Sequence, residues 1–220
     1  MKENVNGYIR KSLIVLASIV LLSFGVIFVV GAAWGQDPLS TLELGVENTF
    51  GIKMGTVDLI IEILVLVAAF FINRKYIHIG TVLYAFLFGP VMNFWFATVS
   101  PLLPAADTIP MKLLFIAVGI LIMSFALAFY IPVEMGYQCS DILAFMIGDA
   151  IHKGYGYGMT ISGVIMFAVG VLLGAPWGIG TVIATFAIGP LVTFFVKLTT
   201  PFVRKLAGMP AVTEAEAEAA

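Results

Sequence analysis

"IGTVLYAFLFGP", residues 79–90, and "IGTVIATFAIGP", residues 179–190, are two copies of one apolar segment. They are identical at seven of 12 positions and lie 100 residues apart. The duplication extends beyond them at nearly the same spacing. Ser23-Phe24 recurs as Ser124-Phe125, and the glycines at 45, 51 and 55 recur at 148, 154 and 158. The chain is therefore built from two related halves.

The composition indicates an integral membrane protein. Hydrophobic residues make up 61% of the 220 residues, charged residues 11%, and the mean hydropathy is +1.08. A soluble domain of this length cannot bury so much apolar surface. A net charge of −2 without a basic stripe argues against nucleic-acid binding. The single cysteine, Cys139, excludes an internal disulfide framework and supports no metal site.

Hydropathy predicts an all-α membrane protein with six transmembrane helices. The spans cover residues 12–34, 54–72, 77–99, 111–133, 156–173 and 178–199. Two short helices are expected over 37–51 and 140–154, with Asp37 and Ser140 as their N-caps. A helix of about 14 residues is roughly 21 Å long, which is too short to cross the hydrocarbon core. They are either interfacial or re-entrant.

Span, short helix, span, span is the unit that occurs twice. The first unit covers residues 1–104, the second covers 105–206, and 207–220 is expected to be a disordered cytoplasmic tail because it is small, acidic and without apolar content. Because each unit has an odd number of spans, the second must enter the membrane from the opposite face. The prediction is an inverted-topology repeat, a plan common among secondary transporters.

Basic residues predict the orientation. Most of them precede the first span, join the second to the third, precede the fifth or follow the sixth, which places them on one side of the membrane. The positive-inside rule then puts both termini in the cytoplasm.

Each copy of the repeated segment ends in a glycine-proline pair near the middle of a span. Pro90 and Pro190 remove a backbone donor and crowd the carbonyl four residues earlier. Gly89 and Gly189 permit another helix or a substrate to approach the backbone. These residues are predicted to form kinks along a permeation pathway; the alternative is a kink that only shapes packing.

Acidic residues at membrane depth are the candidate binding groups, because such carboxylates must protonate, bind a cation or reach water. Asp58 and Glu62 lie one turn apart in the second span, with Glu62 near the midplane. Glu43 and Glu47, with Asn48 beside them, are the expected outer vestibule. Alternatively, Glu43 and Glu47 lie on the water-exposed face of an interfacial amphipathic helix.

The second half lacks these acids at the matching positions. It carries instead Asp141, Asp149 and His152 on a short helix expected on the cytoplasmic side. Asn93 in the third span, matched by Thr193, is a further candidate lining residue.

No metalloprotease helix, nucleophile elbow or phosphate-binding loop occurs in the sequence, so neither an enzyme nor a cofactor is expected.

The stretch "GQDPLSTLELGVENTFGIKMGT", residues 35–56, together with the paired "IGT…GP" segments, resembles the bacterial YczE/YitT-like integral membrane proteins. The resemblance covers roughly residues 10–200. The second half departs from it, because "YQCSD" lacks a glycine-proline start. The resemblance implies a bacterial inner membrane and assigns no binding residue.

These observations together predict a secondary carrier in contact with the lipid bilayer. Its expected substrate is a small cation, or a small organic solute moved with protons or cations through the embedded carboxylates. A channel of the same architecture and a non-transporting scaffold or regulator are the alternatives. Association into a homo-oligomer is compatible with the sequence.

Overall fold

The structure is a computed structural model that describes residues 5–52, 54–72 and 74–210, and all regular elements in these ranges are helical. The α-helices are α1 (Val5–Gly31), α2 (Pro38–Phe50), α3 (Met54–Ile72), α4 (Ile79–Thr98), α5 (Ile109–Tyr130), α6 (Cys139–Ala150), α7 (Tyr155–Leu172) and α8 (Ile179–Ala207). The 3₁₀ turns are η1 (Arg74–Tyr76), η2 (Ser100–Leu102) and η3 (Ile131–Val133).

Each predicted span overlaps one long helix, which confirms the all-α, multi-span class. Five helices in the described ranges are long and apolar enough to cross a membrane, while α3 contains only the shorter apolar stretch Ile60–Ile72. The helices differ from the predictions mainly at their ends. α1 starts seven residues before position 12, and α8 continues past 199 through Pro201. These extensions carry charged residues, which a hydropathy threshold leaves out.

The two short helices begin differently. Asp37 caps α2 as predicted: its carboxylate accepts from the Ser40 N–H at 3.1 Å and from the Ser40 hydroxyl at 2.6 Å. The prediction of Ser140 as the cap of α6 is wrong, because α6 begins at Cys139 and Gln138 holds the cap position without a side-chain bond. The Gln138 carbonyl closes the first turn by accepting from the Ile142 N–H at 2.9 Å.

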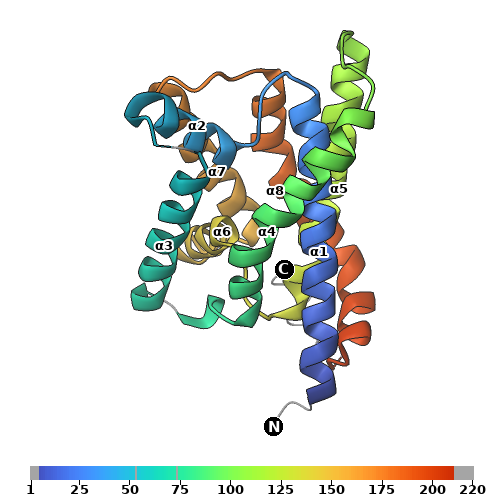
Figure 1. The fold of residues 1–220 in the computed structure, drawn as a ribbon. Coiled ribbons are helices and arrows are strands. Elements are labelled where there is room, and N and C mark those ends of the chain that lie inside the picture. Colours follow the sequence, from blue (N-terminus) through green and yellow to red (C-terminus); the bar gives the residue numbers. More distant parts are fainter. Residues whose placement is uncertain (1–4, 53, 73, 211–220) are drawn as a thin grey trace.

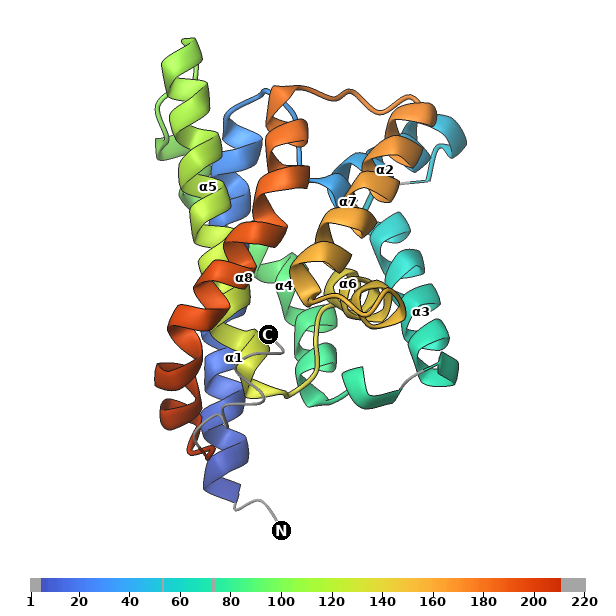
Figure 2. The same ribbon diagram turned by 180° about the vertical axis from the view of Figure 1, so that it is seen from behind.

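Figures 1 and 2 show how the helices are grouped. The long helices α1, α5 and α8 pack on one side, and α2, α3, α6 and α7 lie on the other, with α4 between them. In both views α1 and α4 run in one direction and α5 and α8 run in the other. The main core lies between α1, α5 and α8, where Val15, Ile116 and Val192 are buried.

The two copies of the repeated segment make the same backbone contact with chain from the opposite half. The Gly80 N–H donates to the Met135 carbonyl at 2.6 Å, and the Gly180 N–H donates to the Trp34 carbonyl at 2.9 Å. A Cβ at Gly80 would lie 2.6 Å from the first of these oxygens, and one at Gly180 would lie 2.9 Å from the second. Only glycine fits at either position.

The threonine after each of these glycines completes the contact. Thr81 Oγ1 accepts from the Tyr137 N–H at 3.1 Å, and Thr181 Oγ1 accepts from the Gln36 N–H at 3.0 Å. The segments held in this way lead directly into α6 and α2. Each half therefore fixes the start of the other half's short helix.

α7 is glycine-rich because three helices approach it closely. A Cβ at Gly170 would lie 2.5 Å from the Thr41 carbonyl of α2, and one at Gly156 would lie 2.9 Å from the Gly189 carbonyl of α8. A Cβ at Gly158 would overlap the Ala144 carbonyl of α6. Close crossings at small residues are typical of membrane helices, which have no hydrophobic driving force between them.

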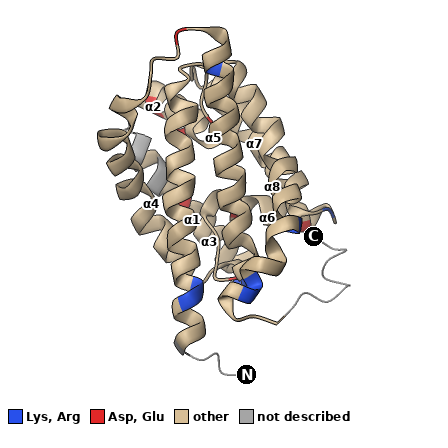
Figure 3. Cartoon of the chain, turned by 90° about the vertical axis from the view of Figure 1, so that its right-hand side faces the viewer, with Lys and Arg blue, Asp and Glu red and all other residues tan. Residues whose placement is uncertain are grey.

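Charge is distributed along the bundle as the sequence predicts. In Figure 3 most basic residues lie at the end where α1 begins and α8 ends, and Lys112 at the start of α5 lies at the other end.

One ion pair lies at the first of these ends, where Lys75 Nζ bonds Asp149 Oδ2 at 2.7 Å. Partial burial favours a higher pKa for Asp149, but hydrogen bonds from Lys75 and Tyr76 outweigh it and lower that pKa. Since the pair is half exposed, it contributes about 1 kcal/mol at most.

We predict that the two glycines of the glycine-proline pairs respond oppositely to alanine. A Cβ at Gly189 would lie 2.5 Å from the Gly156 carbonyl, whereas a Cβ at Gly89 would meet nothing within 4 Å. Gly189→Ala should lower the free energy of unfolding by about 1–3 kcal/mol through overpacking. Gly89→Ala should leave it unchanged or raise it by up to about 1 kcal/mol through helix propensity. Thermal unfolding of both variants in detergent checks this, and an equal loss in both would contradict it.

Candidate functional site

A cavity of about 390 Å³ lies at the centre of the bundle. Residues of α1, α2, α4, α5, α6, α7 and α8 line it, and no α3 residue whose side chain is described is among them. Its polar lining residues come from both halves of the chain: Asp37, Ser40, Glu43, Asn93, Gln138, Ser140, Asp141, Ser162 and Thr185.

The first turns of both short helices face this cavity. α2 contributes its cap and the first residues after it, and α6 contributes Gln138, Ser140 and Asp141. A helix lying flat on a surface would expose one side of its first turn to water. Here Thr41 and Glu43 of α2 and Asp141 of α6 are all buried, so both helices start inside the bundle.

The cavity wall carries more negative than positive charge. Asp37, Glu43 and Asp141 supply carboxylates, and the described lining residues include no lysine or arginine. The positive ends of two helix dipoles offset part of this charge. Asp37 is largely engaged in capping its own helix, which leaves Glu43 and Asp141 as the buried acids of the two halves.

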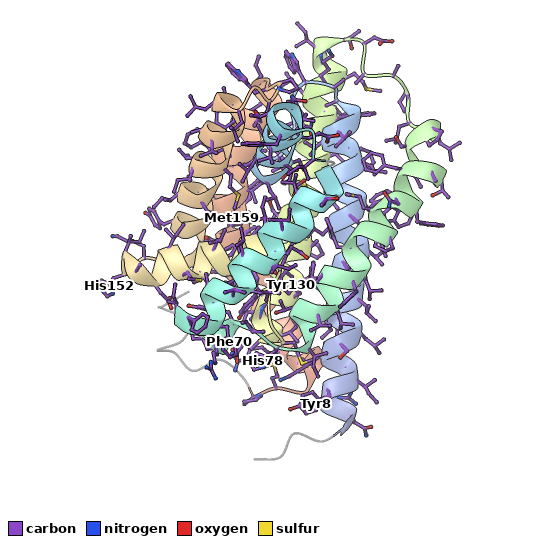
Figure 4. All side chains as sticks on the ribbon, turned by 60° about the vertical axis from the view of Figure 1, so that its left-hand side comes forward. Tyr8, Phe70, His78, Tyr130, His152 and Met159 are labelled. Carbon is purple, nitrogen blue, oxygen red and sulfur yellow. The ribbon has the colours of Figure 1, made fainter. Side chains whose placement is uncertain are left out.

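Asp141 is held by two tyrosines. The Tyr130 hydroxyl donates to Oδ2 of Asp141, and the Tyr155 hydroxyl donates to Oδ1 at 2.7 Å. Asp141 is 1% exposed, and Tyr130 is 1% exposed beside it. The phenol groups satisfy both carboxylate oxygens, so Asp141 can remain ionised in an interior with little water. Figure 4 shows Tyr130 among the helices at the middle of the bundle.

Further aromatic rings extend from this acid toward α1. The Tyr84 and Tyr130 ring centroids are 4.8 Å apart, and the Tyr84 hydroxyl shares a hydrogen bond of 2.8 Å with Ser18. Behind Tyr155 the Phe145 ring lies 4.7 Å away, centroid to centroid. These rings pack around the two tyrosines that hold Asp141.

The remaining wall of the cavity is apolar and adaptable. Four methionines line it, from α4, α5 and α7, together with Phe88 and aliphatic side chains; they are Met92, Met123, Met159 and Met166. Methionine side chains are flexible and polarizable and adapt to ligands of different shape. Met159, labelled in Figure 4, accepts a hydrogen bond from the Tyr155 hydroxyl at 3.5 Å through its Sδ.

Three residues predicted from the sequence lie in the cavity wall. They are Glu43, 5% exposed, and Gly89 and Asn93, both on α4. The interpretation of Glu43 as the wet face of a surface helix is wrong, because the start of α2 is enclosed by α7 and by the cavity.

The other predicted acids lie elsewhere. Glu62 is half-buried on α3 and outside the cavity wall, and its carbonyl accepts from Cys139 Sγ at 3.5 Å. The side chain of Asp58 lies outside the described residues. Glu47 and Asn48 are in the last turns of α2, where the Asn48 amide donates to the Gly174 carbonyl at 3.1 Å. Neither lines the cavity.

In each glycine-proline pair, the proline and the glycine lie on different sides of their helix. Pro90 and Pro190 are exposed on the outside of the bundle, within continuous helices. Gly89 faces the cavity, whereas Gly189 packs against α7. Of the four predicted pathway residues, Gly89 alone lines the cavity.

Sequence reasoning missed the part played by Asp141. Asp141 was expected only as a residue of a short helix on the cytoplasmic side, but it lines the same cavity as Glu43. The available signal was an aspartate in the first turn of an apolar helix, a position that stabilises the turn electrostatically wherever that turn lies. Tyr130 and Tyr155 are 11 and 14 residues away, and no local pattern joins them to it. No group of three metal-ligating acids, histidines or cysteines occurs within the described ranges.

Comparisons with known proteins agree with the membrane class. The model of a family of unknown function, DUF6198, matches residues 9–197. The chain is 24% identical over 182 residues to "Uncharacterized membrane protein YczE" of Bacillus subtilis, covering 81% of each chain. It is 21% identical over 180 residues to "Uncharacterized protein YyaS" of the same organism, covering 82% of this chain and 89% of that protein. No solved structure matches.

The expected likeness to YczE is thereby confirmed, while these comparisons do not confirm the likeness to YitT. The family match extends over 189 residues, from the first turns of α1 to the last turns of α8. It includes every helix that lines the cavity. The chain belongs to the family of unknown function DUF6198.

Proposed function

We propose that the protein is a secondary carrier for a small organic cation, bound in the central cavity. The observation that carries this proposal is the cavity itself, which both halves of the chain line with carboxylates and which has no basic residue among its described lining residues. Its volume of about 390 Å³ suits a compact solute. The methionine-rich wall would contact the apolar body of the solute, and the carboxylates would neutralise its charge.

The proposed architecture is an inverted-topology repeat of units 1–104 and 105–206. Three observations support it: the paired Gly80 and Gly180 contacts, the matching threonine contacts, and the opposite directions of α1 and α5. Carriers of this plan bind their solute near the midplane, between the units. The cavity lies between the starts of α2 and α6, one from each unit.

The proposed transport step uses a difference between the units. α7 packs tightly against α8 at Gly156 and Gly189, but the corresponding helices of the first unit, α3 and α4, make no comparable contact among the described residues. Gly89 therefore has open space beside it. An exchange in which α3 closes on α4 while α7 separates from α8 would turn the cavity toward the other side of the membrane.

The proposed location is a bacterial inner membrane, with the basic end of the bundle in the cytoplasm. Support comes from the membrane protein of Bacillus subtilis that the chain resembles, and from the position of Arg10, Lys11 and Arg204 at one end. Both α1 and α8 have a terminus at this end.

We predict that proteoliposomes of the protein take up at least one cation of a panel in a saturable manner. The panel is sodium, potassium, methylammonium, choline and tetraethylammonium, and the uptake of each isotopically labelled cation is measured at two pH values. Glu43→Gln should lower the uptake at least tenfold, because it removes a buried carboxyl group from the cavity wall. Asp149→Asn, at an exposed position, should retain it. Linear, non-saturating flux would favour a channel, and silence across the panel a scaffold. Glu62→Gln in the same assay tests whether the site extends to α3.

We also predict that the cavity selects reagents by charge. Ser162 lines the cavity and Ser124 is buried outside it, so cysteine at these two positions, in a Cys139→Ala background, forms a matched pair. A trimethylammonium thiosulfonate should modify Ser162→Cys at least tenfold faster than the sulfonate analogue, because the wall is acidic. Neither should modify Ser124→Cys. Faster reaction with the anionic reagent would rule out a cationic substrate.

A further inference from the structure

We propose that Asp141 is the group at which the carrier exchanges a proton for its cationic solute, and that Tyr155 and Met159 form the switch that accompanies this exchange. The inference rests on the proposed function and deepens it, because it assigns proton coupling to one carboxyl group of the second half.

The first support is the position of Asp141. Its side chain is buried in the bundle and lines the cavity, so a solute bound in the cavity can reach it. It lies on α6, which is too short to span the membrane and begins inside the bundle. A carboxyl group at the midplane is where a carrier must hold a proton or cation that is to be released on either side.

The second support is the set of groups that face Asp141. Tyr130 of α5 and Tyr155 of α7 donate to it, and Tyr84 of α4 and Tyr137, just before α6, lie near enough to interact with its charge. Among the described residues, the other titratable groups of the cavity wall are acids, Asp37 and Glu43 on α2. In the proposed exchange, the charge that balances Asp141 comes from a proton or from the solute.

The third support is that Tyr155 has two partners. Its hydroxyl lies 2.7 Å from Oδ1 of Asp141 and 3.5 Å from Sδ of Met159. When Asp141 is ionised, the hydroxyl donates to the carboxylate. When Asp141 is protonated on Oδ1, its new O–H needs an acceptor, and the Tyr155 oxygen becomes available once the hydroxyl turns toward Met159. Tyr130 is less free to turn, because its oxygen already accepts from the Gln138 N–H at 3.4 Å.

The exchange balances as one proton for one monovalent cation. With the cavity open to one side, the O–H bond of protonated Asp141 breaks, the proton leaves to water on that side, and the carboxylate pairs with the entering cation. After the cavity has turned, the cation leaves and water on the second side returns a proton to the carboxylate. The membrane is crossed by equal charge in both directions.

Infrared difference spectroscopy of the full-length protein in lipid vesicles tests this without requiring transport. The carbonyl band of a protonated carboxyl group should appear as the pH falls, vanish in Asp141→Asn and persist in Glu43→Gln. Tyr155→Phe, which removes a donor to the carboxylate, should move the midpoint of the band to higher pH by roughly one unit. Met159→Leu, which removes the second acceptor and keeps the side-chain volume, should move it to lower pH by roughly a few tenths.

The opposite signs of these two shifts are the decisive result, because loosened packing would not move the midpoint in two directions. Shifts of one sign, or no band attributable to Asp141, would overturn the switch. If the exchange operates, a cation of the panel displaces the proton from Asp141 and lowers the pH midpoint of the carboxyl band. Tetraethylammonium is a suitable member of the panel because it has no exchangeable proton of its own.

A midpoint that no cation of the panel moves would overturn the exchange. If the wild-type vesicles nevertheless transport, the carrier proposal stands and the inference alone fails. If no cation is taken up but cations displace the proton, the carrier proposal fails and Asp141 remains a cation-binding group.

Discussion

The structure depends on a pair of backbone hydrogen bonds that each half makes to the other. Gly80 and Gly180 donate to carbonyls of the segments that lead into α6 and α2. In an interior without water a polar backbone group outside a helix must find a partner in the protein. Glycine permits the close approach and the following threonine binds a second N–H, so two irregular segments are held at depth. The starts of both short helices, and with them the cavity, are consequences of this contact.

The two halves share this frame and fill it differently. In the second half α7 is packed against three helices at glycines, whereas in the first half α3 stands apart from α4 and leaves space beside Gly89. Acidic groups are also placed differently, with Glu43 one turn into α2 and Asp141 in the first turn of α6. The cavity is lined by carboxylates from both halves, and the proposed movement would exchange the two packings.

Much of the fold could be predicted because lipid imposes a simple rule on long apolar segments. The second predicted span coincides with α3, and the two short helices were found within a few residues. The site was predicted only in part. Glu43 and Asn93 could be predicted as lining residues. Glu62 was predicted as the main binding group from its depth along α3, but the sequence does not show which face of α3 the cavity meets. Asp141 was assigned to a surface, because its two tyrosine partners are brought to it only by packing.

The sequence by itself determined the eight α-helices of the described ranges, the duplication and the end at which basic residues gather. These properties follow from local composition and periodicity, which act on each segment separately. Only the tertiary structure decided which polar groups face one another. The contact of Asp141 with Tyr130 and Tyr155, and the separation of Glu62 from the cavity, depend on how helices cross. Those crossings are selected by close packing at small residues and by pairing of buried polar groups between distant segments.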